Sequence, residues 1–137
     1  MRPRANVRVL ITGEGLDLDA ITEALGVEPT YTRLGETYDD WGYTIPRAEC
    51  ASVSERIGAL EAVFGDRAGQ ISAVRERYAA NVSVGLSLHA VIGDEPDLTL
   101  TRGDLAFLGA LGAEFGIDPY PYYPDETDDL PPVGEGA

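Results

Sequence analysis

The sequence predicts a single α+β domain: a ferredoxin-like two-layer sandwich with helices packed on one face of one mixed or antiparallel sheet. Residues 6–12 and 82–90 alternate apolar and polar side chains with a period of two, as half-buried strands do. Segments with helical spacing and capping residues lie between the strand-like segments. Residues 6–34 and 82–123 each read as strand, turn, helix and strand, and two split β-α-β units commonly pack as such a sandwich. The expected order is β-α-β-β-α-α-β-α-β.

The first predicted helix has residues typical of helix caps at both of its ends. Asp17 suits the N-cap of this helix, because a carboxylate accepts hydrogen bonds from the free N–H groups of the first turn. Gly26 suits the C′ position, where the backbone commonly adopts a left-handed conformation. The elements expected in this half are a strand at 6–12, a helix at 17–25, and strands at 30–34 and 41–45, the last closed by Pro46.

The second half of the chain is predicted to begin with two helices, which are followed by a strand, a helix and a last strand. Thr101 and Asp104 resemble a capping box, with Asp in place of the usual Glu. Pro119 and Pro121 demote the last strand to the edge of the sheet, because proline cannot donate to a ladder. The elements expected here are a helix capped by Ser52 or Ser54 and broken at Gly65-Asp66, a helix at 67–79, a strand at 82–90, a helix from Thr101 that buries Leu105, Phe107 or Leu108, Leu111 and Phe115 and stops at Gly116, and a strand at 117–123.

The domain is expected to end where the apolar pattern ends. A chain of 137 residues is long enough for one ordinary domain and short for two. Residues 1–123 hold all the periodic segments and are predicted to form this domain. Residues 124–137 are acidic and rich in proline, with no apolar period, so they are predicted to be a disordered tail.

The net charge of −14 limits the classes of partner. All ten basic residues are arginine, and they face 24 acidic residues. Such a balance repels phosphate backbones, so nucleic-acid binding is not expected. It favours long-range attraction to a basic partner protein, with solubility alone as the alternative reason for the acidity.

The sequence is typical of a cytoplasmic protein. Cys50 is the only cysteine, so an intrachain disulfide cannot form, which suits a reducing compartment. The apolar run that follows the basic N-terminus stops at Thr12, too early for a secretory signal peptide. No apolar stretch approaches the length of a membrane span, and no contact with a membrane is expected.

Several residues together resemble a known bacterial family. They are the turn Gly13-Glu14-Gly15-Leu16-Asp17, then Ile21 with Ala24-Leu25-Gly26, Glu28-Pro29-Thr30, Arg33-x-Gly35, Trp41, Leu100-Thr101 and Ile117-Asp118-Pro119-Tyr120. This pattern is similar to the domain-of-unknown-function 4279 family over nearly all of residues 6–122, and the order of elements carries the match. The resemblance implies a small α+β domain and no established activity, cofactor or catalytic residue. The acidic loop before Trp41 departs from the pattern.

No catalytic, cofactor or metal site is predicted. His89 is the only histidine, and alternation places it on the polar face of its strand beside Ser87, as a solvent-facing side chain. Cys50 lies just before a predicted helix start, where the helix dipole could lower the pKa of its thiol, but the neighbouring Glu49 opposes this effect. An ordinary thiol is expected, and a pair with His89 is a minor alternative. The acid pair Asp39-Asp40 is expected to be solvated, and one histidine and one cysteine cannot complete a zinc site.

The best candidate for a binding surface is aromatic. The aromatic residues Tyr31, Tyr38, Trp41 and Tyr43 lie near Arg33, and these residue types often anchor interfaces. The predicted binding residues are Tyr31, Arg33, Trp41 and Tyr43. Alternation along a strand also predicts that about half of such a set serves the core. A second aromatic group around Tyr120 on the edge strand could pair with another copy of the chain.

The preferred hypothesis is a non-catalytic protein-binding module, for example an immunity-type or regulatory protein that binds a basic partner. The charge and the lack of a catalytic set favour it over an enzyme. The alternative is an enzyme or small-molecule-binding domain with a pocket near Arg33 and Trp41. A homodimer through the Tyr120 edge strand is the third hypothesis.

Overall fold

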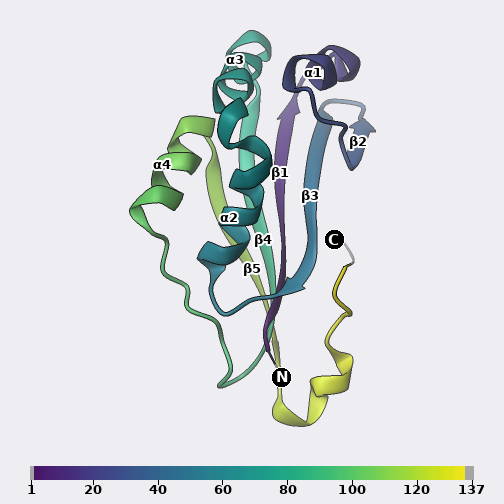
Figure 1. Cartoon of the computed structure of the whole chain (residues 1–137). Helices are drawn as coiled ribbons and strands as arrows, with labels where there is room; N and C mark the ends of the chain where they lie inside the picture. Colours follow the sequence, from purple (N-terminus) through teal and green to yellow (C-terminus); the bar gives the residue numbers. More distant parts are fainter. Residues whose placement is uncertain (1, 135–137) are drawn as a thin grey trace.

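A computed structural model describes residues 2–134 and shows an α+β fold. Within these residues the chain forms one five-stranded sheet, and the α-helices all lie on one face of it (Figure 1). The elements are β1 (Arg4–Gly13), α1 (Leu18–Leu25), β2 (Tyr31–Leu34), β3 (Asp39–Glu49), α2 (Val53–Phe64), the 3₁₀ turn η1 (Gly65–Arg67), α3 (Ala68–Tyr78), β4 (Asn81–Val91), α4 (Arg102–Leu111), β5 (Glu114–Tyr122) and the 3₁₀ segment η2 (Pro124–Asp129). The predicted order of strands and helices is confirmed.

The strand order is β2-β3-β1-β4-β5. β1 is antiparallel to both β3 and β4, and β2 is antiparallel to β3. β1 and β2 therefore run parallel with β3 between them, so β1-α1-β2 is a split β-α-β unit, as predicted. The second split unit was expected in β4-α4-β5, and this is wrong, because β4 and β5 pair directly in parallel. Instead β3 and β4 form the second split unit, with β1 between them. Membership of the ferredoxin-like class stays a prediction.

The core lies between the sheet and the helices. On β1, Val7, Val9 and Ile11 are fully buried, and on β4 the alternate residues Val82, Val84, Leu86, Leu88 and Ala90 are buried, as predicted. The helices contribute one or two apolar residues per turn, among them Ile21, Ile57, Leu60, Ile71 and Leu111. The helices cover only this face, and the other face of the sheet, here called the open face, carries polar and small side chains together with tyrosines such as Tyr31 and Tyr120.

Both ends of α1 follow the predicted capping. The Asp17 side chain accepts a hydrogen bond from the N–H of Ala20 at 3.0 Å. Gly26 has φ of 68°, in the left-handed region, and its N–H returns to the carbonyl of Thr22. The helix therefore has defined ends, which fixes where the chain enters β2.

The end of α4 differs from the prediction. Its capping box of Thr101 and Asp104 is confirmed, but the helix ends at Leu111, with Gly112 as the left-handed C-cap at φ of 66°. Phe115 consequently belongs to β5, and Leu105 is 56% exposed. The reason is that Gly112 already meets the steric demand of a helix end, so the later Gly116 is free to lie in a strand.

β3 is also longer than predicted. It continues through Pro46 to Glu49, whereas Pro46 was expected to close it. The register with β1 shifts between Ala5 and Val7, which pair with Ala48 and Ile45. The two residues between, Pro46 and Arg47, therefore face a single residue of β1 in a bulge. A bulge is a place where a sheet tolerates proline, because the ladder is already interrupted there.

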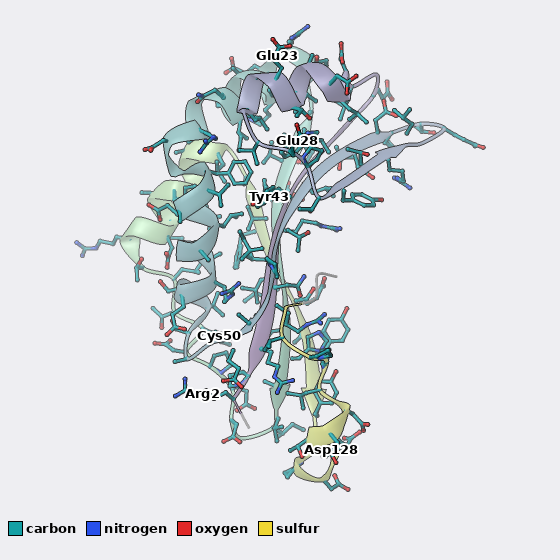
Figure 2. All side chains as sticks on the ribbon, turned by 45° about the vertical axis from the view of Figure 1, so that its right-hand side comes forward. Arg2, Glu23, Glu28, Tyr43, Cys50 and Asp128 are labelled. Atoms are coloured by element: carbon teal, nitrogen blue, oxygen red, sulfur yellow. The ribbon has the colours of Figure 1, made fainter. Side chains whose placement is uncertain are left out.

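Residues 124–134, here called the tail segment, begin with η2 beyond the lower end of the sheet and then turn back along the open face (Figure 2). Leu130 is 6% exposed, and Gly134 N–H donates to the carbonyl of Arg47. Residues of the predicted tail therefore contact the sheet. The mobility of the tail and the domain boundary at residue 123 stay predictions. Residues 135–137 of that tail lie outside the described residues.

Among residues 2–134, no helix combines the length and apolar character needed to cross a membrane.

A hydrogen bond from the Trp41 indole joins β3 to α1. Its Nε1–H donates to Thr22 Oγ1 at 3.0 Å, and the side chain has no exposure. Replacing Thr22 by Val keeps the shape but leaves the buried N–H without an acceptor. We expect the free energy of unfolding in urea to fall by about 1–3 kcal/mol. Thr32→Val, on the exposed strand β2, is the control and should change it little; an equal loss in both variants would contradict this account.

Candidate functional site

The β2–β3 hairpin is the most exposed part of the sheet. Every residue from Thr30 to Tyr38 is exposed, including all four residues of β2. Leu34 is 76% exposed and Tyr38 is 52% exposed. Large apolar side chains at such exposure are candidates for contact with a partner. We call Tyr31, Arg33, Leu34, Glu36 and Tyr38 the hairpin surface.

The turn of this hairpin is held by Asp39. One carboxylate oxygen accepts from the N–H of Leu16 at 3.1 Å, and the other accepts from the N–H of Gly35 at 3.3 Å. A Cβ added to Gly35 would collide with the carbonyl oxygen of Tyr38, so the turn requires glycine for its close backbone approach. The exposed residues are therefore mounted on a tight turn that is tied to the loop after β1.

Asp40 connects the hairpin to the central strand. This residue is 5% exposed, and it accepts from Thr12 Oγ1 and from Arg33 Nε, each at 2.8 Å. The expectation that Asp39 and Asp40 are solvated is wrong. β3 begins at Asp39, so alternation turns Asp40 to the open face beneath Arg33, where both neighbours donate to it.

The four predicted binding residues divide between the two faces of the sheet. Trp41 is fully buried under α1, and Tyr43 is half-buried on the same face, with an edge-to-face contact to Phe64 at 5.3 Å between ring centroids. Figure 2 shows Tyr43 between the helices and the sheet. Tyr31 and Arg33 lie on the open face instead, because Tyr31 pairs with Gly42 and not with Trp41 or Tyr43. The structure thus brings Tyr31 and Arg33 together and places the other two in or against the core.

Tyr31 has a neighbour that the sequence did not suggest. Its ring packs over Gly42, where a Cβ would meet it at 3.5 Å, and the Arg8 guanidinium lies 5.6 Å from the ring centroid. Such a contact is a cation–π interaction. Arg8 is separated from Tyr31 by 23 residues, so only the strand order brings the two together.

Two open hollows flank the hairpin. One, of about 360 Å³, is lined by residues that include Thr12, Tyr38 and Tyr78. The other, of about 530 Å³, is lined by Leu34 and by the acidic entry to α1, which includes Asp17 and Asp19. Sequence reasoning missed Leu34 as part of this site, although an apolar residue next to a turn could have raised the question.

Cys50 is a buried free cysteine. Burial raises the pKa of the Cys50 thiol; the Arg56 charge opposes this and the Glu55 charge adds to it. A raised pKa disfavours the thiolate, which is the reactive form. Among residues 2–134, no group of three or more metal-ligating side chains gathers.

His89 lies on the open face, as alternation predicts, but its ring is partly covered. Its Nδ1 lies 2.9 Å from Tyr122 Oη, and the ring stacks on Tyr120 at 4.6 Å. Burial, with the charge of Arg47 as a second cause, holds the pKa of His89 below its usual value of 6.5. The neutral ring is therefore favoured.

These features define a class of protein: a small α+β domain whose sheet is covered by helices on one face and carries an exposed hairpin on its edge. A family model described as "Domain of unknown function (DUF4279)" matches residues 3–122, so the chain belongs to this family. Comparison with curated proteins and with solved structures gave no significant match.

Asp40 provides a test of how the hairpin is held. Replacing it by Asn removes the charge and turns a donor toward Thr12 or Arg33. We expect a loss of about 1–3 kcal/mol in the free energy of unfolding, since a buried group loses its partner. Hydrogen exchange at residues 31–38 should speed up more than in β4. Glu36→Gln, an exposed change of charge in the same hairpin, is the matched control, and similar behaviour of the two variants would contradict this role.

The lowered pKa of His89 predicts a pH dependence. A group whose folded-state pKa lies below its unfolded value stabilises the fold above the unfolded pKa, near 6.5, and loses this contribution as the pH falls through the folded pKa. The stability of the wild type relative to His89→Gln should therefore decrease between pH 7.5 and 5. Urea unfolding at both values measures it, and carboxylates titrate alike in the two proteins. A difference that grows on acidification would show that the sign is wrong.

Proposed function

We propose that this protein is a non-catalytic protein-binding module that recognises a basic partner through the hairpin surface. The observation that carries the proposal is the presence of exposed apolar side chains beside acidic residues on a tight turn held by hydrogen bonds. Leu34 and Tyr38 would supply the buried anchors of such an interface. Glu36 on the turn and Asp17 and Asp19 beside it would supply the acidic rim.

The use of arginine supports the charge argument. Arg67 donates to the carbonyls of Leu25 and Val63 at 3.0 and 2.6 Å, and Arg56 donates to the carbonyl of Pro46 at 2.9 Å. These guanidinium groups satisfy main-chain acceptors and do not neutralise carboxylates. The chain carries a net charge of −14, which would attract a basic protein and accelerate encounter.

Arg33 has a positioning role in this proposal. Its side chain is 56% exposed, and its Nε is engaged by Asp40. It would orient the hairpin and present Tyr31, while Trp41 and Tyr43 support the strand from the core side. An immunity-type or regulatory role fits such a module, since either acts by covering a surface of its partner. A cytoplasmic location is part of the proposal, as the free thiol of Cys50 suits a reducing compartment.

A small-molecule-binding or enzymatic role is the alternative. The hollow beside Thr12 and Tyr38 favours it, because the hydroxyl of Tyr78, which lines this hollow, is buried with no hydrogen-bond partner in the described part of the chain. A ligand with a polar group could satisfy that hydroxyl. A screen of small ligands by thermal melting would test it, and a flat profile would remove this alternative.

A homodimer through β5 is a separate proposal. Tyr120 on this edge strand is 47% exposed, and Tyr123, which directly follows the strand, is 66% exposed. Pro119 and Pro121 remove two N–H donors from it, so side chains would have to supply much of the contact. Light scattering at high protein concentration tests it, and a monomeric mass would end it.

The basic-partner proposal predicts a selective loss of binding. In affinity capture from native lysate at low and moderate salt, Leu34→Ser with Tyr38→Ser should reduce recovery of the partner by about tenfold or more, because anchors of this kind contribute at least 1.4 kcal/mol. Moderate salt should weaken capture by the wild type. Leu105→Ser, at a similarly exposed leucine on α4, is the control. Recovery of no partner at either salt, or equal loss in the control, would count against the proposal.

A further inference from the structure

A second charged surface lies at the opposite end of the sheet from the hairpin. Arg4 and His89 are paired neighbours on β1 and β4, and Arg47 lies in the bulge of β3 on the other side of β1. The chain has ten arginines, one histidine and 24 acidic residues. Two of these arginines and the histidine lie together on one part of the open face. Together with Asn6 and Tyr122 they form what we call the basic patch.

The tail segment is seated on this patch. Arg4 Nη1 donates to the carbonyl of Pro131 at 2.7 Å, and Arg47 Nη1 donates to the carbonyl of Pro132 at 3.3 Å. Leu130, just before them, is buried with φ of −63° and ψ of 133°, close to the polyproline II conformation. The patch thus holds an extended backbone through its carbonyl oxygens.

The tail segment and the basic patch differ in charge, although the hydrogen bonds that join them use the carbonyls of Pro131 and Pro132. The tail segment carries Asp125, Glu126, Asp128 and Asp129 and no basic residue. Asp128 lies in η2, beyond the lower end of the sheet and on the side away from the helices (Figure 2). An acidic segment is therefore the kind of chain that this part of an otherwise acidic protein can attract.

The fit between patch and tail is incomplete. Asn6 is 2% exposed, and its Oδ1 has no hydrogen-bond donor among the described residues. Asn6 lies on β1 two residues from Arg4 and opposite the bulge that carries Arg47. Pro131 and Pro132 have no N–H to offer. A buried acceptor without a donor is costly, so a segment that brings an N–H to this point would pair better than the tail does.

The basic patch lies within the region that matches the family model, whereas the tail segment lies outside it. The matched region, residues 3–122, contains every residue of the basic patch and none of the tail segment. The tail joins β5 through Tyr123 alone, so it can leave the patch without unpairing a strand.

We propose that the basic patch is a binding site for an extended acidic segment of a partner protein, and that the tail segment occupies this site in cis as an intramolecular competitor. A tethered competitor reaches an effective concentration in the millimolar range, so it lowers the apparent affinity for any segment offered in trans. Release of the tail exposes the site.

The test uses the full chain and a fluorescent synthetic peptide of residues 124–134. Leu130→Asp places a charge where the tail is buried and should release it, while circular dichroism confirms that the fold is kept. Fluorescence anisotropy should show that this variant binds the peptide at least about tenfold more tightly than the wild type. Adding Arg4→Gln should reverse the gain about fivefold or more. Arg77→Gln on α3, which makes the same charge change in the helical layer, should not.

The proposal would be overturned by equal peptide affinity of wild type and Leu130→Asp, by insensitivity to Arg4→Gln, or by equally tight binding of a peptide with Asn and Gln in place of its acids. A dimer of Leu130→Asp that binds no added peptide would assign the patch to a second copy and also overturn it. If Leu130→Asp does not fold, the wild type is titrated with millimolar peptide and followed by NMR. Shifts at Arg4 and His89 would support the site, and unchanged spectra would overturn it. The hairpin variants test the proposed function separately.

Discussion

The packing of helices on only one face of the sheet is the constraint on which the rest of this structure depends. β1 is paired on both edges, and its residues Val7, Val9 and Ile11 are wholly buried against the helical layer. Burial of this kind is the main source of stability in a domain of this size. The same pairing turns Arg4, Arg8 and the other alternate side chains of β1 to the face that no α-helix covers. The polar groups on this face therefore need hydrogen-bond partners from elsewhere in the chain.

The charged side chains of the open face find different hydrogen-bond partners at its two ends. Near the hairpin, the carboxylate of Asp40 collects Thr12 and Arg33, and glycine at position 42 lets Tyr31 lie flat beneath Arg8. Near the N-terminus of β1, arginines bind the carbonyls of the tail segment. In both places a charged group is partly removed from water and is compensated by hydrogen bonds, as buried charge requires. The two ends of the open face are thus stabilised by different partners, a carboxylate near the hairpin and main-chain carbonyls near the start of β1.

The predictable part of the site follows from the same physics. Tyr31 and Arg33 could be proposed from residue type, and they do lie together on the exposed strand. Trp41 and Tyr43 were proposed with them, yet they face the core, because the pairing of Tyr31 with Gly42 sets the two strands one residue out of phase. The partnership of Asp40 with Thr12, and that of Arg4 with the tail, join residues 28 and 127 positions apart. No local pattern contains such information.

The sequence by itself determined the order of elements, the caps at Asp17, Gly26 and Thr101, and the buried faces of β1 and β4, because these depend on periodicity and on contacts within a few residues. Only the tertiary structure decided that β4 and β5 are direct neighbours, that Pro46 lies within a bulged strand, that α4 ends at Gly112, and that the tail segment covers the basic patch. Each of these depends on which distant backbone supplies the hydrogen-bond partners, and strand register and packing set that choice.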